Sequence, residues 1–262
     1  MKHFPRKRFG QHFLTDQTVI AAIVAAIRPQ ADDAMVEIGP GLGALTKPLA
    51  AVLRRLDVIE IDRDIIARLR RAYPAERLSI HAGDVLEFDF SVLPRDLRVV
   101  GNLPYNISTP LLFHLARYAE RIRDMHFMLQ KEVVERMVAA PGGGDYGRLS
   151  VMLQYRFDME LLLDVPPEAF SPPPQVDSAV VRMHPRPQAQ LAATSEGGLA
   201  QVVRRAFAQR RKTLRNSLAG LLEAQDYAAL AIVPGLRAEN LAVADFVAIS
   251  NYLEKKDKST GS

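Results

Sequence analysis

The stretch Gly101-Asn102-Leu103-Pro104-Tyr105-Asn106-Ile107-Ser108-Thr109-Pro110 decides how this chain is organised. The apolar run Leu97–Val100 before it predicts a buried strand, and the leucines at positions 111, 112 and 115 have the spacing of a helix face. Within the loop, Asn102 offers an amide, Tyr105 offers a flat ring, and Pro104 restricts the backbone before it. Such a loop suits a planar ligand that carries an amino group, although asparagine and proline are also common in ordinary turns.

Short apolar runs alternate with helical patterns on both sides of this stretch. This alternation predicts an α/β fold, in which a parallel sheet has helices on both faces. The later runs are expected to form an antiparallel edge of the sheet. The predicted strands are Ala34–Ile38, Leu56–Ile61, Leu78–Ala82, Leu97–Gly101, Met125–Gln130, Leu149–Phe157, Met159–Val165 and Ala179–Met183.

The segment His184-Pro185-Arg186-Pro187-Gln188 resembles a linker between two kinds of sequence. After it there are no strand signals, and the pattern predicts a helix from Leu199 to Leu222 followed by shorter helices. We therefore expect an α/β domain over residues 1–185 with a basic N-terminal arm, a smaller all-α domain over residues 186–254, and a disordered tail over residues 255–262.

Composition narrows the class of protein. The chain has 262 residues, of which 48% are hydrophobic, enough for a sizeable core. Its net charge of +4 and its sequence pI of about 9.4 are compatible with a polyanionic partner. The sequence contains no cysteine, which excludes disulfides and thiolate metal sites, and we expect no metal. Neither a membrane span nor the apolar core of a signal peptide is found, so we expect a cytoplasmic protein without membrane contact.

Three predicted strands end in residues that suit a nucleotide-like ligand. The first runs into Gly39-Pro40-Gly41-Leu42-Gly43-Ala44, whose glycines let the backbone approach a ligand closely. Glu60 ends the second strand, where a carboxylate can accept both hydroxyl groups of a ribose. These two features fit NAD as well as other cofactors. Asp84 follows the third strand and could accept from an adenine amino group, which favours a different cofactor.

In this order, Glu37-Ile-Gly-Pro-Gly-Leu-Gly, Glu60, Gly83-Asp84 and Asn102-Leu-Pro-Tyr resemble the S-adenosylmethionine-dependent N6-adenine methyltransferases. Further segments are similar to the ribosomal RNA adenine dimethyltransferases, in particular those of the small subunit. These segments are Arg8–Leu14, Phe127–Val133, Tyr146–Ser150, Phe170–Ser178 and Phe207–Asn216. The resemblance covers nearly the whole chain and implies a Rossmann-like class I methyltransferase fold for the first domain.

The resemblance also implies a reaction. It is the transfer of methyl groups from S-adenosylmethionine to N6 of two adjacent adenosines in the 3′-terminal hairpin loop of 16S rRNA, during small-subunit assembly. Many relatives have asparagine where this chain has His12, so a side-chain contact and a backbone contact both stay open there. Carried over by position, the cofactor-binding residues are His12, Leu14, Gly39, Gly41, Glu60, Asp84 and Asn102.

The chemistry of the loop favours catalysis by positioning. A methyl sulfonium is already activated, so the protein must mainly align nitrogen, carbon and sulfur. Acceptors at the Asn102 side chain and the Leu103 carbonyl would stabilise the positive charge that develops on the amine. Pro104 fixes this loop, and Tyr105 and Phe170 could sandwich an extruded base. We predict no general base, and core packing is the alternative role for Phe170.

Basic residues recur along the predicted C-terminal helix. Arg204, Arg211 and Arg215 would share one stripe of that helix, with Lys212 beside them. We predict that these four side chains contact phosphates of the 16S rRNA within the small subunit or its precursor, although a solvated helix face is the ordinary alternative. The arm at residues 2–8 could contact RNA or fold over the cofactor pocket. We expect a monomer.

Three alternatives stay open. A large-subunit rRNA adenine methyltransferase is disfavoured by Phe170-Ser-Pro-Pro-Pro and by Arg210-Arg-Lys-Thr-Leu-Arg. A non-catalytic RNA-binding assembly factor with the same fold is disfavoured by the intact Asn102-Leu-Pro-Tyr loop. An NAD-dependent dehydrogenase would explain neither Asp84 nor that loop.

Overall fold

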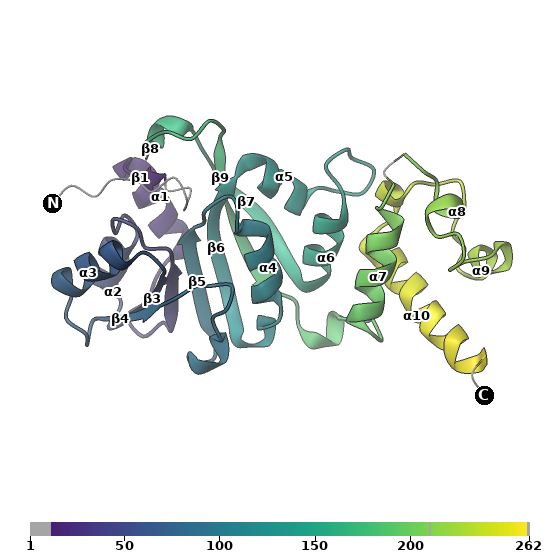
Figure 1. Cartoon of the computed structure of the whole chain (residues 1–262), viewed down its shortest axis with the longest axis horizontal. Helices are drawn as coiled ribbons and strands as arrows, with labels where there is room; N and C mark the ends of the chain where they lie inside the picture. Colours follow the sequence, from purple (N-terminus) through teal and green to yellow (C-terminus); the bar gives the residue numbers. More distant parts are fainter. Residues whose placement is uncertain (1–11, 210, 261–262) are drawn as a thin grey trace. The chain divides into compact units, whose positions relative to one another are not determined.

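The protein is described from a computed structural model, which covers residues 12–209 and 211–260 (Figure 1). The chain forms two compact units. The first contains the described residues up to Val134 together with Asp158–Pro185, and the second contains Glu135–Phe157 and the described residues from Arg186 onward. The sequence predicts a single boundary after residue 185, whereas residues 135–157 belong to the second unit. The basic arm at residues 2–8 lies outside the described residues.

A seven-stranded sheet forms the centre of the first unit (Figure 1). In spatial order its strands are β4 (Leu78–Ala82), β3 (Leu56–Glu60), β2 (Met35–Ile38), β5 (Leu97–Asn102), β6 (Ile122–Gln130), β9 (Ser178–Pro185) and β7 (Phe157–Val165). Neighbours from β4 to β6 pair in parallel, and β9 pairs antiparallel with β6. This arrangement confirms the predicted α/β fold.

The strand order reverses between β2 and β5. From β2 the chain moves outward to β3 and β4, then returns to β5 on the other side of β2 and continues to β6. In sheets of this kind, a crevice forms outside the carboxyl ends of the strands at such a switch point, and ligands bind there. The topology therefore places the glycine turn after β2 and the loop after β5 beside one crevice.

Helices pack their apolar faces against this sheet. Asp16 caps the amino end of α1 (Gln17–Ile27), because its side chain accepts from the N–H groups of Thr18 and Val19 at 2.7 and 3.1 Å. Its buried isoleucines join strand residues in one apolar core. The other helices of this unit are α2 (Thr46–Val52), α3 (Arg63–Ala72), α4 (Ser108–Ala116), η2 (Phe90–Val92), η3 (Ala119–Arg121) and η4 (Pro167–Ala169).

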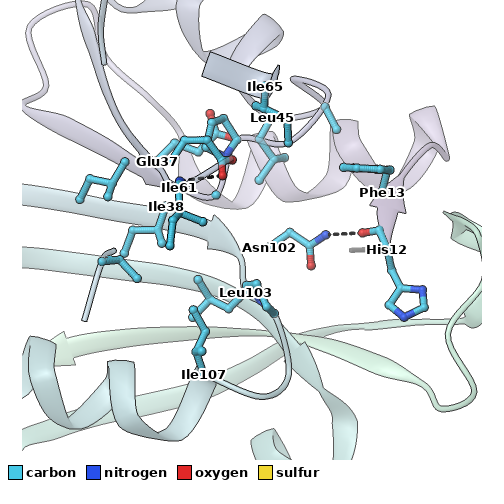
Figure 2. A pocket seen from close by; sticks show the side chains of 18 of the residues that line it. His12, Phe13, Glu37, Ile38, Leu45, Ile61, Ile65, Asn102, Leu103 and Ile107 are labelled. Carbon is cyan, nitrogen blue, oxygen red and sulfur yellow. Dashed lines mark hydrogen bonds between the residues drawn. The ribbon is translucent and has the colours of Figure 1, made fainter. Parts of the chain in front are cut away.

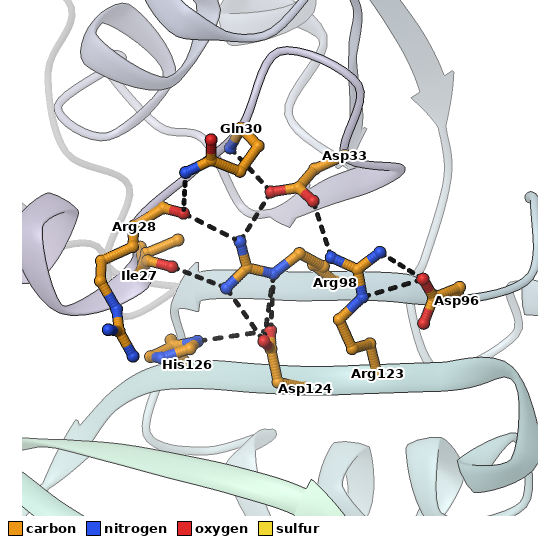
Figure 3. A network of polar contacts seen from close by, with 9 residues as sticks. All are labelled: Ile27, Arg28, Gln30, Asp33, Asp96, Arg98, Arg123, Asp124 and His126. Atoms are coloured by element: carbon orange, nitrogen blue, oxygen red, sulfur yellow. Dashed lines mark hydrogen bonds and ion pairs between the residues drawn. The ribbon is translucent and has the colours of Figure 1, made fainter.

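A buried ion-pair network joins the amino ends of β5 and β6 to the end of α1 (Figure 3). The Arg98 guanidinium donates to the carbonyl of Ile27 at 2.6 Å and to the carboxylates of Asp33 at 2.7 Å and Asp124 at 3.0 Å. Ile27 is the last residue of α1, so Arg98 satisfies a carbonyl that the helix end leaves without an intrahelical partner. Arg123 donates to Asp33 at 2.7 Å and extends the network.

A two-stranded ribbon fixes the beginning of the described chain. β1 (Phe13–Leu14) pairs antiparallel with β8 (Phe170–Ser171), with Phe13 opposite Ser171 and Leu14 opposite Phe170. The N–H of Thr15 also donates to the carbonyl of Ala169 at 2.8 Å. The sequence does not predict this ribbon, because two-residue strands show no periodic pattern. Its consequence is that His12 lies beside the crevice.

The segment predicted as a strand over Leu149–Phe157 is a helix, α6 (Arg148–Arg156). Its buried residues include alternate positions from 149 to 155, which mimics the period of a strand. The Ser150 hydroxyl accepts from the N–H of Gly147 at 2.9 Å and donates to the carbonyl of Arg136 at 2.5 Å. The first contact closes the first turn of the helix, and the second ties that turn to α5 (Lys131–Val138). Packing within the second unit then buries Val151 and Tyr155.

Helices also build the rest of the second unit around an apolar core. They are α5 (Lys131–Val138), which leads into the unit, and α7 (Glu196–Ala206), α8 (Leu214–Ser217), α9 (Ala224–Ala229), α10 (Val243–Thr260), η5 (Gln188–Gln190) and η6 (Ala238–Asn240). The predicted helix from Leu199 to Leu222 is interrupted. The N–H groups of Leu214 and Arg215 donate to the carbonyls of Leu236 and Pro234, at 2.7 and 3.0 Å, rather than to a preceding helical turn.

The tail predicted to be disordered over residues 255–262 is largely helical. α10 continues to Thr260, and only residues 261 and 262 of that range lie outside the description. The Lys256 ammonium lies 2.8 Å from the carboxylate of Asp226, which also accepts from the Tyr252 hydroxyl at 2.8 Å. A buried carboxylate therefore anchors this end of the helix, an interaction that local composition does not reveal.

Candidate active site

A cavity of about 310 Å³ opens where the strand order reverses, at the carboxyl ends of β2 to β5 (Figure 2). The structure brings every residue predicted to bind the cofactor to this cavity, together with the loop after β5. These lining residues are His12, Leu14, Gly39, Gly41, Glu60, Asp84, Asn102, Leu103, Pro104 and Tyr105. Their gathering at one edge follows from the parallel strands, whose carboxyl ends lie side by side.

The turn after β2 exposes its backbone to the cavity. Gly39 and Gly41 have φ angles of 65° and 54°, in the left-handed region that favours glycine. A Cβ atom at Gly41 would lie 3.1 Å from Cδ1 of Phe13. A side chain at this position would therefore be strained and would press on the ribbon that borders the cavity.

Gly101 lets β5 approach β2 closely just before the loop. A Cβ atom at this position would lie 2.7 Å from the carbonyl oxygen of Ile38, which is too short for any real contact. A larger residue would therefore push the two strands apart and move Asn102, which ends β5. The sequence alone predicts no role for Gly101, because a single sequence does not show how closely two strands pack.

Two buried carboxylates lie at the tips of β2 and β3. Burial raises the pKa of Glu37 to about 7, although its Oε2 accepts from the Thr46 hydroxyl at 2.6 Å. Burial also raises the pKa of Glu60, while its Oε1 accepts from the N–H groups of Ile61 and Asp62 at 2.8 Å each. The sequence predicts no role for Glu37 beyond its place in the motif. A charged residue inside an apolar strand could have marked it as a candidate site residue.

Asp84 supplies a third carboxylate, which is exposed at the tip of β4. Its Oδ1 accepts from the N–H of Leu86 at 2.9 Å, which fixes the orientation of the side chain beside the cavity. The three acidic tips are therefore arranged in the order β2, β3, β4, moving away from the loop after β5. An elongated ligand that contacted all of them would have one end at Asn102.

The amide of Asn102 is oriented by the ribbon. Its Nδ2 donates to the backbone carbonyl of His12 at 3.0 Å, and Figure 2 shows the amide oxygen directed away from His12. This contact engages the NH₂ group of the amide, so the side-chain oxygen is the atom that can accept from a ligand in the cavity that Asn102 lines. Leu103 is held next to it, because its N–H donates to the carbonyl of Met128 at 3.1 Å.

Tyr105 is half-buried at the end of the loop. Its hydroxyl lies 2.8 Å from the hydroxyl of Ser178, and burial raises the pKa of the phenol. Its ring is nearly parallel to that of His12, with an interplanar angle of 22° and centroids 6.0 Å apart. The imidazole Nδ1 of His12 lies 2.9 Å from the carbonyl oxygen of Pro172. The backbone of His12 thus contacts Asn102, and its side chain lies beside Tyr105.

The structure does not place Phe170 at the cavity. Its side chain is 4% exposed and belongs to the apolar core, where its strand pairs with Leu14. The prediction that Phe170 and Tyr105 sandwich a base is therefore replaced by its alternative, core packing, for Phe170. Burying the phenyl ring in the apolar core removes its surface from water, which is more favourable than leaving the ring exposed.

The four residues predicted to contact RNA lie in the second unit and are exposed. Arg204 is in the last turn of α7, Arg211 and Lys212 lie between α7 and α8, and Arg215 is in α8. The predicted single stripe along one helix is wrong, because the chain leaves the helix after Ala206. The residues are nevertheless close together in the sequence and unburied.

The described part of the chain holds neither a candidate metal site nor a helix that could span a membrane. Over residues 12–209 and 211–260, no group of three or more His, Asp or Glu side chains is placed to hold a metal ion. Within the same residues, no helix is both long and apolar enough to cross a membrane.

The reversed strand order, the glycine turn, the acidic strand tips and the Asn-Leu-Pro-Tyr loop define the class of protein: a Rossmann-like methyltransferase fold. A family model described as ribosomal RNA adenine dimethylase matches residues 2–255. This chain belongs to that family.

Individual relatives agree with this assignment. The chain is 66% identical over 251 residues to "Ribosomal RNA small subunit methyltransferase A" of Thiobacillus denitrificans, covering 96% of this chain and 98% of the relative. It is 66% identical over 256 residues to the protein of the same name from Chromobacterium violaceum, covering 97% and 98%. Among solved structures, a dimethyladenosine transferase from Plasmodium falciparum has a TM-score of 0.79 at 26% identity, covering 94% of this chain and 98% of that one.

Proposed function

We propose that this chain transfers methyl groups from S-adenosylmethionine to N6 of two adjacent adenosines in the 3′-terminal hairpin loop of 16S rRNA, during small-subunit assembly. Membership of the ribosomal RNA adenine dimethylase family and the names of the similar proteins support this proposal. The observation that carries it is the Asn102 amide, whose donor side is held by His12 so that its acceptor side is left for an amine.

The residues of the cavity fit S-adenosylmethionine. This cofactor supplies an activated methyl group on a positively charged sulfur, a charge that the carboxylates at the strand tips complement. Glu60 would accept the ribose hydroxyl groups, and Asp84 would accept from the adenine amino group. The glycine turn at Gly39 and Gly41 would let the backbone approach the remainder of the ligand.

Asn102 and Leu103 would align the target amine. An exocyclic amine conjugated to adenine is a poor nucleophile, because its lone pair is delocalised into the ring. Two acceptors, the Asn102 side-chain oxygen and the Leu103 carbonyl, would hold its two N–H groups and stabilise the positive charge that develops on nitrogen. The amine loses a proton to water after the transfer, so no side chain has to act as a base beforehand. Catalysis then consists mainly of positioning.

Tyr105 would hold the target base by stacking. A base in a folded RNA must leave its neighbours before its amino group can reach a cavity, and an aromatic face compensates part of the stacking that is lost. The ring of Tyr105 lines the cavity next to Asn102. It is therefore the residue that we assign to the base, with Phe170 supporting the ribbon from the core.

The experiment that tests the proposed function uses labelled S-adenosylmethionine and separated small and large ribosomal particles that lack adenine dimethylation. We expect label in N6,N6-dimethyladenosine of the small-subunit RNA only. Label in the large-subunit RNA would show the related large-subunit activity instead. No label in either particle, with cofactor binding intact, would indicate a non-catalytic assembly factor.

The exposed basic residues of the second unit are proposed to contact rRNA phosphates. Reversing the charge at Arg211 and Arg215 should weaken binding to small-subunit precursors and reduce the salt dependence of affinity by about one unit of slope per lost contact. Reversal of Arg54, an exposed residue of the first unit paired with Asp32, is the matched control. An unchanged salt slope in the Arg211 and Arg215 variant would refute the phosphate contacts.

A further inference from the structure

Ser178 is a buried residue that touches the loop after β5 without lining the cavity. It is the first residue of β9 and is 1% exposed, and its backbone pairs with Gln130 of β6. Its hydroxyl oxygen lies 2.8 Å from that of Tyr105. In the sequence, Ser178 is the last residue of the Phe170–Ser178 motif, and it has no role in the proposed function. Because pairing in the sheet holds its backbone in place, the Ser178 hydroxyl can fix the position of the Tyr105 hydroxyl through a hydrogen bond.

The same motif restrains the ring of Tyr105 from a second side. The Pro172 carbonyl oxygen lies 2.9 Å from the imidazole Nδ1 of His12, and the imidazole is nearly parallel to the Tyr105 ring. The motif therefore reaches Tyr105 directly through Ser178 and indirectly through His12. A tyrosine hydroxyl is protonated near neutral pH, and burial raises the pKa of Tyr105 further, so the hydroxyl can take part in the hydrogen bond.

The orientation of this ring matters because stacking depends on which way its face is turned. A tyrosine side chain can rotate about two bonds, and a hydroxyl anchored to a rigid strand removes most of that freedom. The transferred methyl group tolerates little misplacement, since alignment supplies much of the catalysis in a reaction of this kind. A ring free to turn would present the base to Asn102 in the correct position only part of the time.

We propose that Ser178 is a positioning residue for methyl transfer. It holds the Tyr105 hydroxyl so that the ring face stands beside the Asn102 amide, where the target base stacks. This inference rests on the proposed function, because it assumes that Tyr105 receives the base. Ser178 would act only through Tyr105, because its buried side chain does not line the cavity.

A double-mutant cycle tests the proposal. The variants are Ser178→Ala, Tyr105→Phe and the two combined, and the measurements are single-turnover methyl transfer to undimethylated small-subunit particles and calorimetric affinity for S-adenosylmethionine. Each single change should slow transfer about two- to tenfold, the range expected from one lost hydrogen bond. The double variant should be no slower than either single variant, and cofactor affinity should be unchanged.

Two further variants separate positioning from folding. Ser178→Thr keeps the hydroxyl and should restore most of the transfer rate. Ser250→Ala removes another buried serine hydroxyl, one that has no hydrogen-bond partner within the described residues, and should leave the rate unchanged. Losses that multiply in the double variant, or a parallel loss of cofactor affinity, would overturn the proposal.

A measurement without turnover distinguishes failure of this inference from failure of the proposed function. In protein labelled at the tyrosine ring Cζ, the NMR signal missing from Tyr105→Phe identifies Tyr105. That signal should shift in Ser178→Ala and return toward its original position in Ser178→Thr. An unmoved signal refutes the hydrogen bond whatever the RNA result, whereas a shifted signal in a protein that methylates no RNA would refute the proposed function alone.

Discussion

The polar and charged side chains at the two ends of the sheet have different partners. At the amino end, Arg98 is surrounded by Asp33, Asp124 and the last carbonyl of α1, so that the buried charges satisfy one another (Figure 3). At the carboxyl end, the backbone of His12 holds the Asn102 amide (Figure 2). Backbone N–H groups hold the Glu60 carboxylate, and both residues line a cavity. Polar groups that pair among themselves hold the fold together, whereas groups fixed by the backbone and turned toward a cavity are available to a ligand.

The largest effect should come from breaking the network at the amino end. Arg98→Met leaves Asp33 and Asp124 buried without their shared partner, and removing one partner of a buried pair costs about 3–5 kcal/mol. Urea unfolding should show a loss of this size in the free energy of unfolding.

Arg54→Met is the control for this variant. Arg54 also pairs with an aspartate, Asp32, at 2.9 Å, but the two side chains are 78% and 73% exposed. An exposed pair contributes about 0–1 kcal/mol, so this variant should unfold nearly as the wild type does. Equal losses in the two variants would contradict the view that burial makes the amino-end network structural.

At the carboxyl end, Tyr105→Ala should reduce function and leave folding nearly intact. Loss of one stacking face is expected to slow methyl transfer by a factor that corresponds to about 1–3 kcal/mol. Calorimetric affinity for S-adenosylmethionine should fall much less. If rate and cofactor affinity fell equally, Tyr105 would belong to the cofactor site, and the assignment of its ring to the base would be wrong.

The smallest expected effect is on the pH dependence of folding stability, to which one buried group near each end of the sheet contributes. His126, in β6 beside the Arg98 network, is buried, and burial lowers its pKa from 6.5 to about 4. Below pH 6.5 the unfolded chain takes up this proton first, so stability falls as the pH drops toward 4. Glu37 behaves in the opposite way. Its pKa rises from 4.5 to about 7, so the folded protein keeps a proton that the unfolded chain has lost, and stability falls as the pH rises through this range.

The two contributions nearly cancel in the wild type, and single variants should separate them. Between about pH 7.5 and about pH 5, each is on the order of 2 kcal/mol. Relative to the wild type, His126→Gln should gain stability on acidification and Glu37→Gln should lose it, as measured by urea unfolding at the two pH values. Changes of the same sign in both variants would contradict the predicted opposition.

The sequence revealed the carboxyl end of the sheet far better than the amino end. Glycines and acidic residues at strand ends, together with Asn102 and Tyr105, form a recognisable order in the chain, and parallel strands bring such residues together. The partners of Arg98 come from positions 27, 33 and 124, and no spacing rule connects them. Contacts between segments that are distant in the sequence explain both the network that was not predicted and the predictions that were wrong.

Two predictions were wrong because the deciding contacts come from residues outside the local pattern. Phe170 belongs to a motif with aromatic and proline residues, but only its pairing with Leu14 shows that its ring enters the core. The strand predicted over Leu149–Phe157 has apolar residues at alternate positions, yet hydrogen bonds at Ser150 and packing in the second unit make it helical. Periodicity identifies which residues are buried more reliably than the element that buries them.

The oriented amide of Asn102 is the central feature of the proposed methyl transfer. The direct test is the single-turnover rate of methyl transfer by Asn102→Ala to undimethylated small-subunit particles, at saturating S-adenosylmethionine. Loss of a preorganised acceptor at the reacting centre should slow transfer by about 10²- to 10³-fold, with the free energy of unfolding within about 1 kcal/mol of the wild type. A rate within about fivefold of the wild type would contradict the claim that this amide positions the target amine.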